Sequence, residues 1–153
     1  MKACDTLRSK PFAEYHPNQR KLVLREGGST YTLENRSNPP EPLMKVQVDG
    51  GLIPPDAGKK CDFLVLRCGR NILYLVELKG SDVRKACVQI LATLEHPEFR
   101  SLLEPDTVLH GRIIPSRTPG PDLRSSEYKR LQTLLKMRSG GLMTKSTPFT
   151  EFL

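Results

Sequence analysis

Tryptophan is absent from this 153-residue sequence, and aromatic residues make up only 6% of it. No apolar run approaches the ~20 residues that a membrane-spanning helix requires; the longest runs are short, such as Phe63–Leu66. The first residues, MKACD, are not followed by the apolar core of a signal sequence. The sequence therefore predicts a cytoplasmic protein with no membrane partner.

Closely spaced cysteines are also absent. None of Cys4, Cys61, Cys68 and Cys87 lies two to four residues from another, and the three histidines are scattered. A zinc site needs such spacings. We therefore expect four reduced thiols in or near the core, and we expect neither a zinc centre nor a secreted disulfide scaffold.

The charge is distributed unevenly. Residues 1–25 carry six Lys/Arg and two acids, and residues 111–145 carry eight Lys/Arg and two acids. The segment between them, 26–110, carries ten basic and twelve acidic residues. An acidic centre between basic segments suits metal ligands surrounded by a phosphate-binding surface, although solubility alone would also account for it.

Hydrophobic periodicity and turn residues predict a mixed α/β domain. We expect strands over 21–25, 30–33, 43–49, 61–67, 72–79 and 107–115, helices over 81–95 and 125–138, and a last edge strand within 142–152. Residues 1–20 are predicted to be irregular. The fold class is thus a mixed central β-sheet flanked by helices, in a single domain 1–153 with an N-terminal hairpin and loop (1–42) and a core (43–153).

Three charged residues stand out in the apolar hairpin at the centre of this order. Asp62 opens one strand, and Glu77 and Lys79 close the next. Glu77 and Lys79 are two residues apart, so their side chains share a face. Asp62 and Glu77 are equally far from the turn at 68–71, so they should lie opposite each other in the ladder. Two carboxylates that converge in a buried sheet repel unless a cation lies between them, and Mg²⁺ prefers such oxygen ligands.

This pattern resembles the PD-(D/E)xK nuclease superfamily, which includes many restriction enzymes, junction resolvases and recombination exonucleases. Gly58 to Asp62 resembles its second motif, Glu77-Leu78-Lys79 resembles its E-x-K motif, and Gln89 resembles a glutamine found on the following helix in some branches. The match covers about a third of the chain directly. It implies a restriction-endonuclease-like core.

The resemblance implies a role for each matching residue. Asp62 and Glu77 would bind Mg²⁺ or Mn²⁺, with the backbone carbonyl of Leu78 as a further ligand. Lys79 would be catalytic, and Gln89 would position water or substrate. The expected activity is hydrolysis of phosphodiester bonds in DNA, and such folds often dimerise, so a homodimer is a possible assembly.

The first motif of the family, often a Glu on an N-terminal helix, has no clear counterpart here. Glu14, Glu34 and Asp49 are the candidates, and Asp49 is favoured as a further metal ligand because it ends the strand before the loop that leads to Asp62. Predicted phosphate contacts near the site are basic: Lys59, Lys60, Arg84 and Lys85.

Other interpretations of these residues stay open. Glu77 and Lys79 are also consistent with a surface ion pair, Asp62 with a solvent-facing strand start, and Gln89 with an exposed helix position. The basic residues are also consistent with a solvated face. The main alternative function is a nucleic-acid-binding module of the same fold that does not cut, since the first motif is incomplete. The other alternative is a small-molecule-binding or protein-interaction domain in which the acids are structural.

Overall fold

The computed structural model describes residues 1–78, 82–117 and 125–153. Its elements, in chain order, are α1 (Lys2–Leu7), β1 (Ala13–His16), β2 (Lys21–Glu26), β3 (Ser29–Glu34), β4 (Leu43–Gln47), β5 (Phe63–Arg67), β6 (Ile72–Leu78), α2 (Val83–Glu95), α3 (Pro97–Arg100), β7 (Val108–Ile114), α4 (Ser126–Lys136), β8 (Leu142–Thr144) and β9 (Phe149–Phe152). None of the helices in these ranges is long and apolar enough to cross a membrane.

The strands form two sheets. A six-stranded mixed sheet has the order β1-β4-β5-β6-β7-β8. The pairs β1–β4, β4–β5 and β5–β6 are antiparallel, and the pairs β6–β7 and β7–β8 are parallel. The β2–β3 hairpin and β9 form a separate three-stranded sheet, in which β9 runs parallel to β3. The parallel step from β6 to β7 passes through α2, the usual crossover for parallel strands. The predicted mixed α/β class is therefore confirmed.

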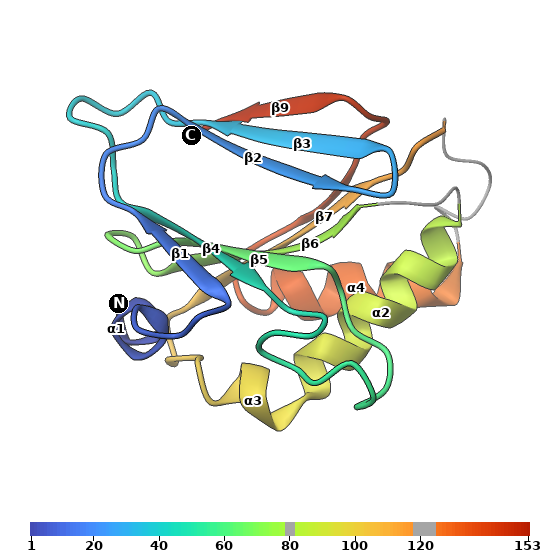
Figure 1. Ribbon diagram of the computed structural model, residues 1–153. Coiled ribbons are helices and arrows are strands. Elements are labelled where there is room, and N and C mark those ends of the chain that lie inside the picture. Colours follow the sequence, from blue (N-terminus) through green and yellow to red (C-terminus); the bar gives the residue numbers. More distant parts are fainter. Residues whose placement is uncertain (79–81, 118–124) are drawn as a thin grey trace.

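The six-stranded sheet is covered by helices on one face and by the three-stranded sheet on the other (Figure 1). Alternation along β5 directs Leu64 and Leu66 to the core cluster of the helix side, and Phe63 and Val65 to the cluster beneath the small sheet. The prediction of a sheet flanked by helices therefore holds for one face only. The predicted N-terminal hairpin buries its own apolar face and takes the place of the second helical layer.

The two ends of the chain differ from the prediction. Residues 1–20, predicted to be irregular, contain α1 and the edge strand β1. The predicted last strand is two strands, β8 in the large sheet and β9 in the small one. These short elements lack the periodicity of longer ones and form because tertiary packing supplies their partners.

One disulfide contradicts the expectation of four reduced thiols. Cys4 in α1 is bonded to Cys68 in the β5–β6 turn, across 64 residues of sequence. Cys61 and Cys87 are buried and form no disulfide, as predicted. The prediction was wrong for the first pair because local spacing carries no sign of a bridge that only folding brings together; in the fold their Cα atoms are 5.9 Å apart.

A buried ion pair joins the small sheet to the large one. Arg112 on β7 donates to both carboxylate oxygens of Glu151 on β9, at 2.7 and 2.9 Å, and the Tyr31 hydroxyl donates to Glu151 at 2.6 Å. Burial alone would raise the pKa of Glu151, but the hydrogen bonds from Arg112 and Tyr31 outweigh it and hold this pKa below the usual value.

Glu151→Gln is expected to destabilise the fold by about 3 kcal/mol at pH 7, because it leaves the Arg112 guanidinium buried without its counter-charge. Since the folded pKa is depressed, the ionised carboxylate contributes stability above the ordinary glutamate pKa, and this contribution is lost as pH falls through the folded pKa. Urea unfolding of both proteins from pH 7 to pH 3 should show the difference shrinking in acid.

Glu34→Gln is the matched control, because Glu34 forms a looser and more exposed pair, 3.6 Å from Arg36, in the same small sheet. A Glu151→Gln variant no less stable than Glu34→Gln at pH 7 would contradict the proposed role of the buried pair.

Candidate functional site

The central hairpin holds Asp62 beside the last residues of β6. Phe63 pairs with Val76, and Asp62 lies one residue before the paired part of β5. The Asp62 amide donates to the Val76 carbonyl at 3.2 Å, and its Oδ2 accepts a hydrogen bond from the Leu78 amide at 2.8 Å. The hairpin spacing predicted Asp62 opposite Glu77, whereas the backbone hydrogen bond joins Asp62 to Val76, one residue earlier in β6. The Leu78 amide holds the Asp62 carboxylate in place.

Both carboxylates are buried. Asp62 is 7% exposed and Glu77 is 1% exposed, so the interpretations with a solvent-facing Asp62 or a surface Glu77 are wrong. Their charge is felt by the neighbouring thiol: burial raises the pKa of Cys61, and the charges of Glu77 and Asp62 raise it further. A buried pair of acids is costly unless something compensates it, which makes this end of the hairpin the strongest functional candidate.

Two further predicted residues follow Glu77 in the sequence, Leu78 and Lys79. Lys79 lies outside the described residues, so its predicted catalytic role stays a prediction taken from the sequence. Leu78 was predicted to offer its carbonyl to a metal, and the contact that the structure gives it is a different one, from its amide to Asp62.

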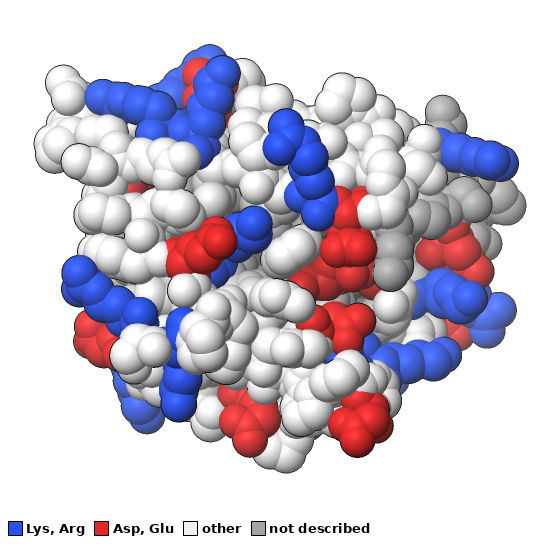
Figure 2. All heavy atoms as spheres, in the orientation of Figure 1, with Lys and Arg blue, Asp and Glu red and all other residues white. Residues whose placement is uncertain are grey.

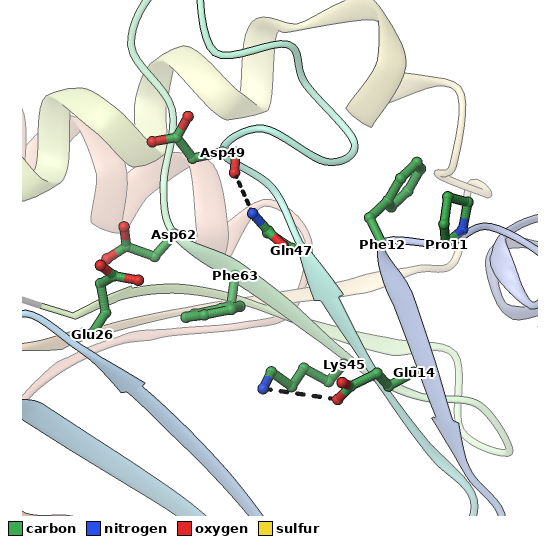
Figure 3. A pocket seen from close by; sticks show the side chains of 9 residues that line it. All are labelled: Pro11, Phe12, Glu14, Glu26, Lys45, Gln47, Asp49, Asp62 and Phe63. Atoms are coloured by element: carbon green, nitrogen blue, oxygen red, sulfur yellow. Dashed lines mark hydrogen bonds and ion pairs between the residues drawn. The ribbon is translucent and has the colours of Figure 1, made fainter.

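A cavity of about 500 Å³ opens beside Asp62 (Figure 3). It is lined by Pro11, Phe12, Glu14, Glu26, Lys45, Gln47, Asp49, Asp62 and Phe63. The predicted ligand Asp49 thus shares a cavity with Asp62. Its side chain is about half exposed, and its Oδ1 lies 3.7 Å from the Lys60 ammonium.

Glu26 is the acid that sequence reasoning missed. It is the last residue of β2, immediately before the Gly27-Gly28 turn, and belongs to the small sheet. Figure 3 shows its carboxylate directed towards that of Asp62. An acid at a strand end beside a glycine turn was the available signal, but nothing in the sequence indicated that this hairpin would fold over the central one.

The other first-motif candidates are placed differently. Glu14 on β1 lines the cavity, 3.8 Å from the Lys45 ammonium. Glu34 lies on β3 and pairs with Arg36, and it does not line the cavity. The structure therefore brings Glu14, Asp49 and Glu26 towards Asp62, each from a different strand or strand end.

The side chains of Lys60 and Gln89 form hydrogen bonds with backbone carbonyls of the protein itself. Lys60 is 6% exposed, and its ammonium donates to the carbonyls of Pro55 and Gly58 at 3.0 and 2.6 Å. Its predicted phosphate contact needs correcting, because a buried ammonium that is already bonded to the chain is not presented to a ligand. The side-chain amide of Gln89 donates to the backbone carbonyl of Lys60 at 3.4 Å. Lys60 lies two residues before Asp62, so Gln89 supports the segment that positions the Asp62 carboxylate.

The remaining predicted phosphate contacts are exposed. Lys59 lies in the loop before Asp62, and Arg84 and Lys85 lie in the first turn of α2. Arg84 also pairs with Glu127 of α4 at 3.1 Å. Figure 2 shows acidic side chains gathered near the middle of this face, below the small sheet, with lysine and arginine side chains on either side.

Comparisons with protein-family models, with curated proteins and with solved structures found no match. The functional argument therefore depends on the residues and their geometry.

The donors around Asp62 fit a hard cation. Carboxylate oxygens are the ligands that Mg²⁺ and Mn²⁺ prefer, and the backbone holds the Asp62 carboxylate in one orientation. Within the described ranges, no three Asp, Glu, His or Cys side chains are close enough to enclose a metal by themselves. An open site of one or two carboxylates, completed by water and substrate phosphate, suits Mg²⁺ better than a closed cage.

Proposed function

We propose that this protein is a divalent-metal-dependent nuclease that hydrolyses phosphodiester bonds in DNA on a restriction-endonuclease-like core. One observation carries the proposal: two buried carboxylates, Asp62 and Glu77, lie at the same end of the central hairpin, and Asp62 lines a cavity that also holds Glu26 and Asp49. The E-x-K pattern that ends in Lys79 supports it from the sequence.

The residues divide the work as follows. Asp62 and Glu77 hold the Mg²⁺, which when bound supplies an activated water and neutralises phosphate charge. The backbone amide of Leu78 keeps the Asp62 carboxylate oriented. The side-chain amide of Gln89 holds the backbone at Lys60, two residues before Asp62. Lys79 stabilises the charge that develops on the phosphate. Glu26 and Asp49 add further carboxylate oxygens to the cavity beside Asp62.

The test is cleavage of supercoiled, linear, single-stranded and branched DNA with Mg²⁺, with Mn²⁺ and with EDTA. We expect cutting with either metal and none with EDTA, together with a higher melting temperature in the presence of metal, because a ligand that binds only the folded state stabilises it. DNA binding without cleavage in any condition would favour the non-cutting binding module. Neither cleavage nor a metal-dependent shift in melting temperature would overturn the proposal.

A further inference from the structure

We infer that the site acts on an unpaired DNA strand, such as a single strand or a frayed end, and not within a continuous duplex. This inference rests on the proposed nuclease function and concerns the shape of substrate that can reach Asp62. It follows from where Asp62 lies in the fold, from the size of the cavity and from the basic side chain of Lys45 among the described residues that line it.

Asp62 lies in a recess between the two sheets and is almost completely buried. One wall of the cavity beside it is Glu26, at the end of β2 in the overlying small sheet. The opposite side is formed by the edge strand β1 and its neighbour β4, through Glu14, Lys45 and Gln47. A scissile phosphate must pass between these walls to reach the Asp62 carboxylate (Figure 3).

A duplex does not fit this approach. The cavity of about 500 Å³ is in the range of sites that enclose one small molecule, roughly 300–1,000 Å³. In a duplex each phosphodiester lies on a stiff rod together with its partner strand, and entry into a recess requires bending or extrusion of the nucleotide, at the expense of stacking and pairing. An unpaired strand bends freely and presents one nucleotide at a time.

The floor of the cavity offers a path for such a strand. Lys45 is the basic residue among the described lining residues, and its ammonium lies 5.2 Å from the centre of the Phe63 ring. Its ion pair with Glu14, at 3.8 Å, is long, so a phosphate can compete for the ammonium. Phe12 and Phe63 add apolar surface, and Gln47 adds an amide able to meet a base edge. We therefore assign to Lys45 the binding of the phosphate next to the scissile one.

The test uses one DNA sequence in three forms with Mg²⁺: a single strand, a blunt duplex closed by hairpins at both ends, and the same closed duplex with a central unpaired bubble. We expect the single strand and the bubble to be cut at least about 100-fold faster than the closed duplex, with cuts in the bubble confined to unpaired positions. Equal rates on the closed duplex would overturn the inference and leave the nuclease proposal standing. No cleavage of any form would overturn both.

Lys45→Ala tests the strand path separately. We expect it to raise KM for the single strand by about 10-fold with kcat retained, as for loss of a contact made equally before and during the reaction. Lys129→Ala removes the same charge from an exposed position on α4 and should leave KM unchanged. An unchanged KM for Lys45→Ala would overturn the assignment of this lysine to the substrate.

Discussion

Asp62→Asn is expected to lower metal-dependent cleavage by at least about 100-fold, the effect typical of removing one group that stabilises charge at a reacting centre. Asparagine keeps the size of the side chain and an oxygen that can accept the hydrogen bond from the Leu78 amide. The variant should therefore fold, and it removes only the negative charge that a cation requires. Initial rates on the DNA forms that the wild-type protein cuts, with Mg²⁺ at several concentrations, measure the loss.

Two companion variants locate the effect. Glu77→Gln should lose activity to a similar extent. Glu26→Gln should lose less, because Glu26 comes from the other sheet and its side chain is exposed at the cavity. Glu95→Gln is the matched control: it makes the same chemical change in an exposed ion pair with Arg130, on the far end of α2.

The melting temperature separates a chemical effect from a structural one. Asp62→Asn should keep the wild-type melting temperature in EDTA, within a few degrees, and lose the increase that metal produces. Wild-type rates in both Asp62→Asn and Glu77→Gln would mean that the cleavage comes from another site or from a contaminant.

Removing the disulfide is expected to cost about 4 kcal/mol of stability. The Cys4–Cys68 bridge closes a segment of 64 residues, and a loop of that length lowers the entropy of the unfolded chain by this amount in the chain-entropy model. For a domain of this size the loss corresponds to a melting temperature lower by roughly 10 °C. Thermal unfolding followed by circular dichroism, with and without dithiothreitol, measures it.

The double variant Cys4→Ala/Cys68→Ala provides the control. It should melt near the temperature of the reduced wild-type protein, and dithiothreitol should not change it further, because Cys61 and Cys87 form no disulfide in the fold. Equal melting temperatures for oxidised wild type, reduced wild type and the double variant would contradict a stabilising role for the bridge.

The central hairpin shows how far local sequence reaches. Two apolar runs separated by a four-residue turn determine which residues pair, and this pairing brings Asp62 to the end of β6 that carries Glu77. The helix that follows was also predictable, although it begins at Val83 with Asp82 as its N-cap, and the predicted cap Ser81 lies outside the described residues. Contacts within one hairpin or one helix depend on short sequence separations, which periodicity and turn residues encode.

Contacts between distant segments were not predictable in this way. Glu26, Cys4 and Glu151 each meet their partners only because an element packs against another far away in the sequence: the small sheet over the large one, α1 beside the β5–β6 turn, and β9 beside β3. The burial of Lys60 is of the same kind, since its charge predicted a surface residue and the loop of residues 50–60 folds around it.

By itself, the sequence determined the mixed α/β class, the hairpin that carries both acids and the helix behind it, because local pairing and periodicity are properties of neighbouring residues. Only the tertiary structure decided that a second sheet covers one face, that Glu26 joins the acids in a recess, and that two of the four cysteines are bridged. These features depend on which apolar faces pack together, and burial of apolar surface is non-directional, so one strand's pattern does not specify its partner layer.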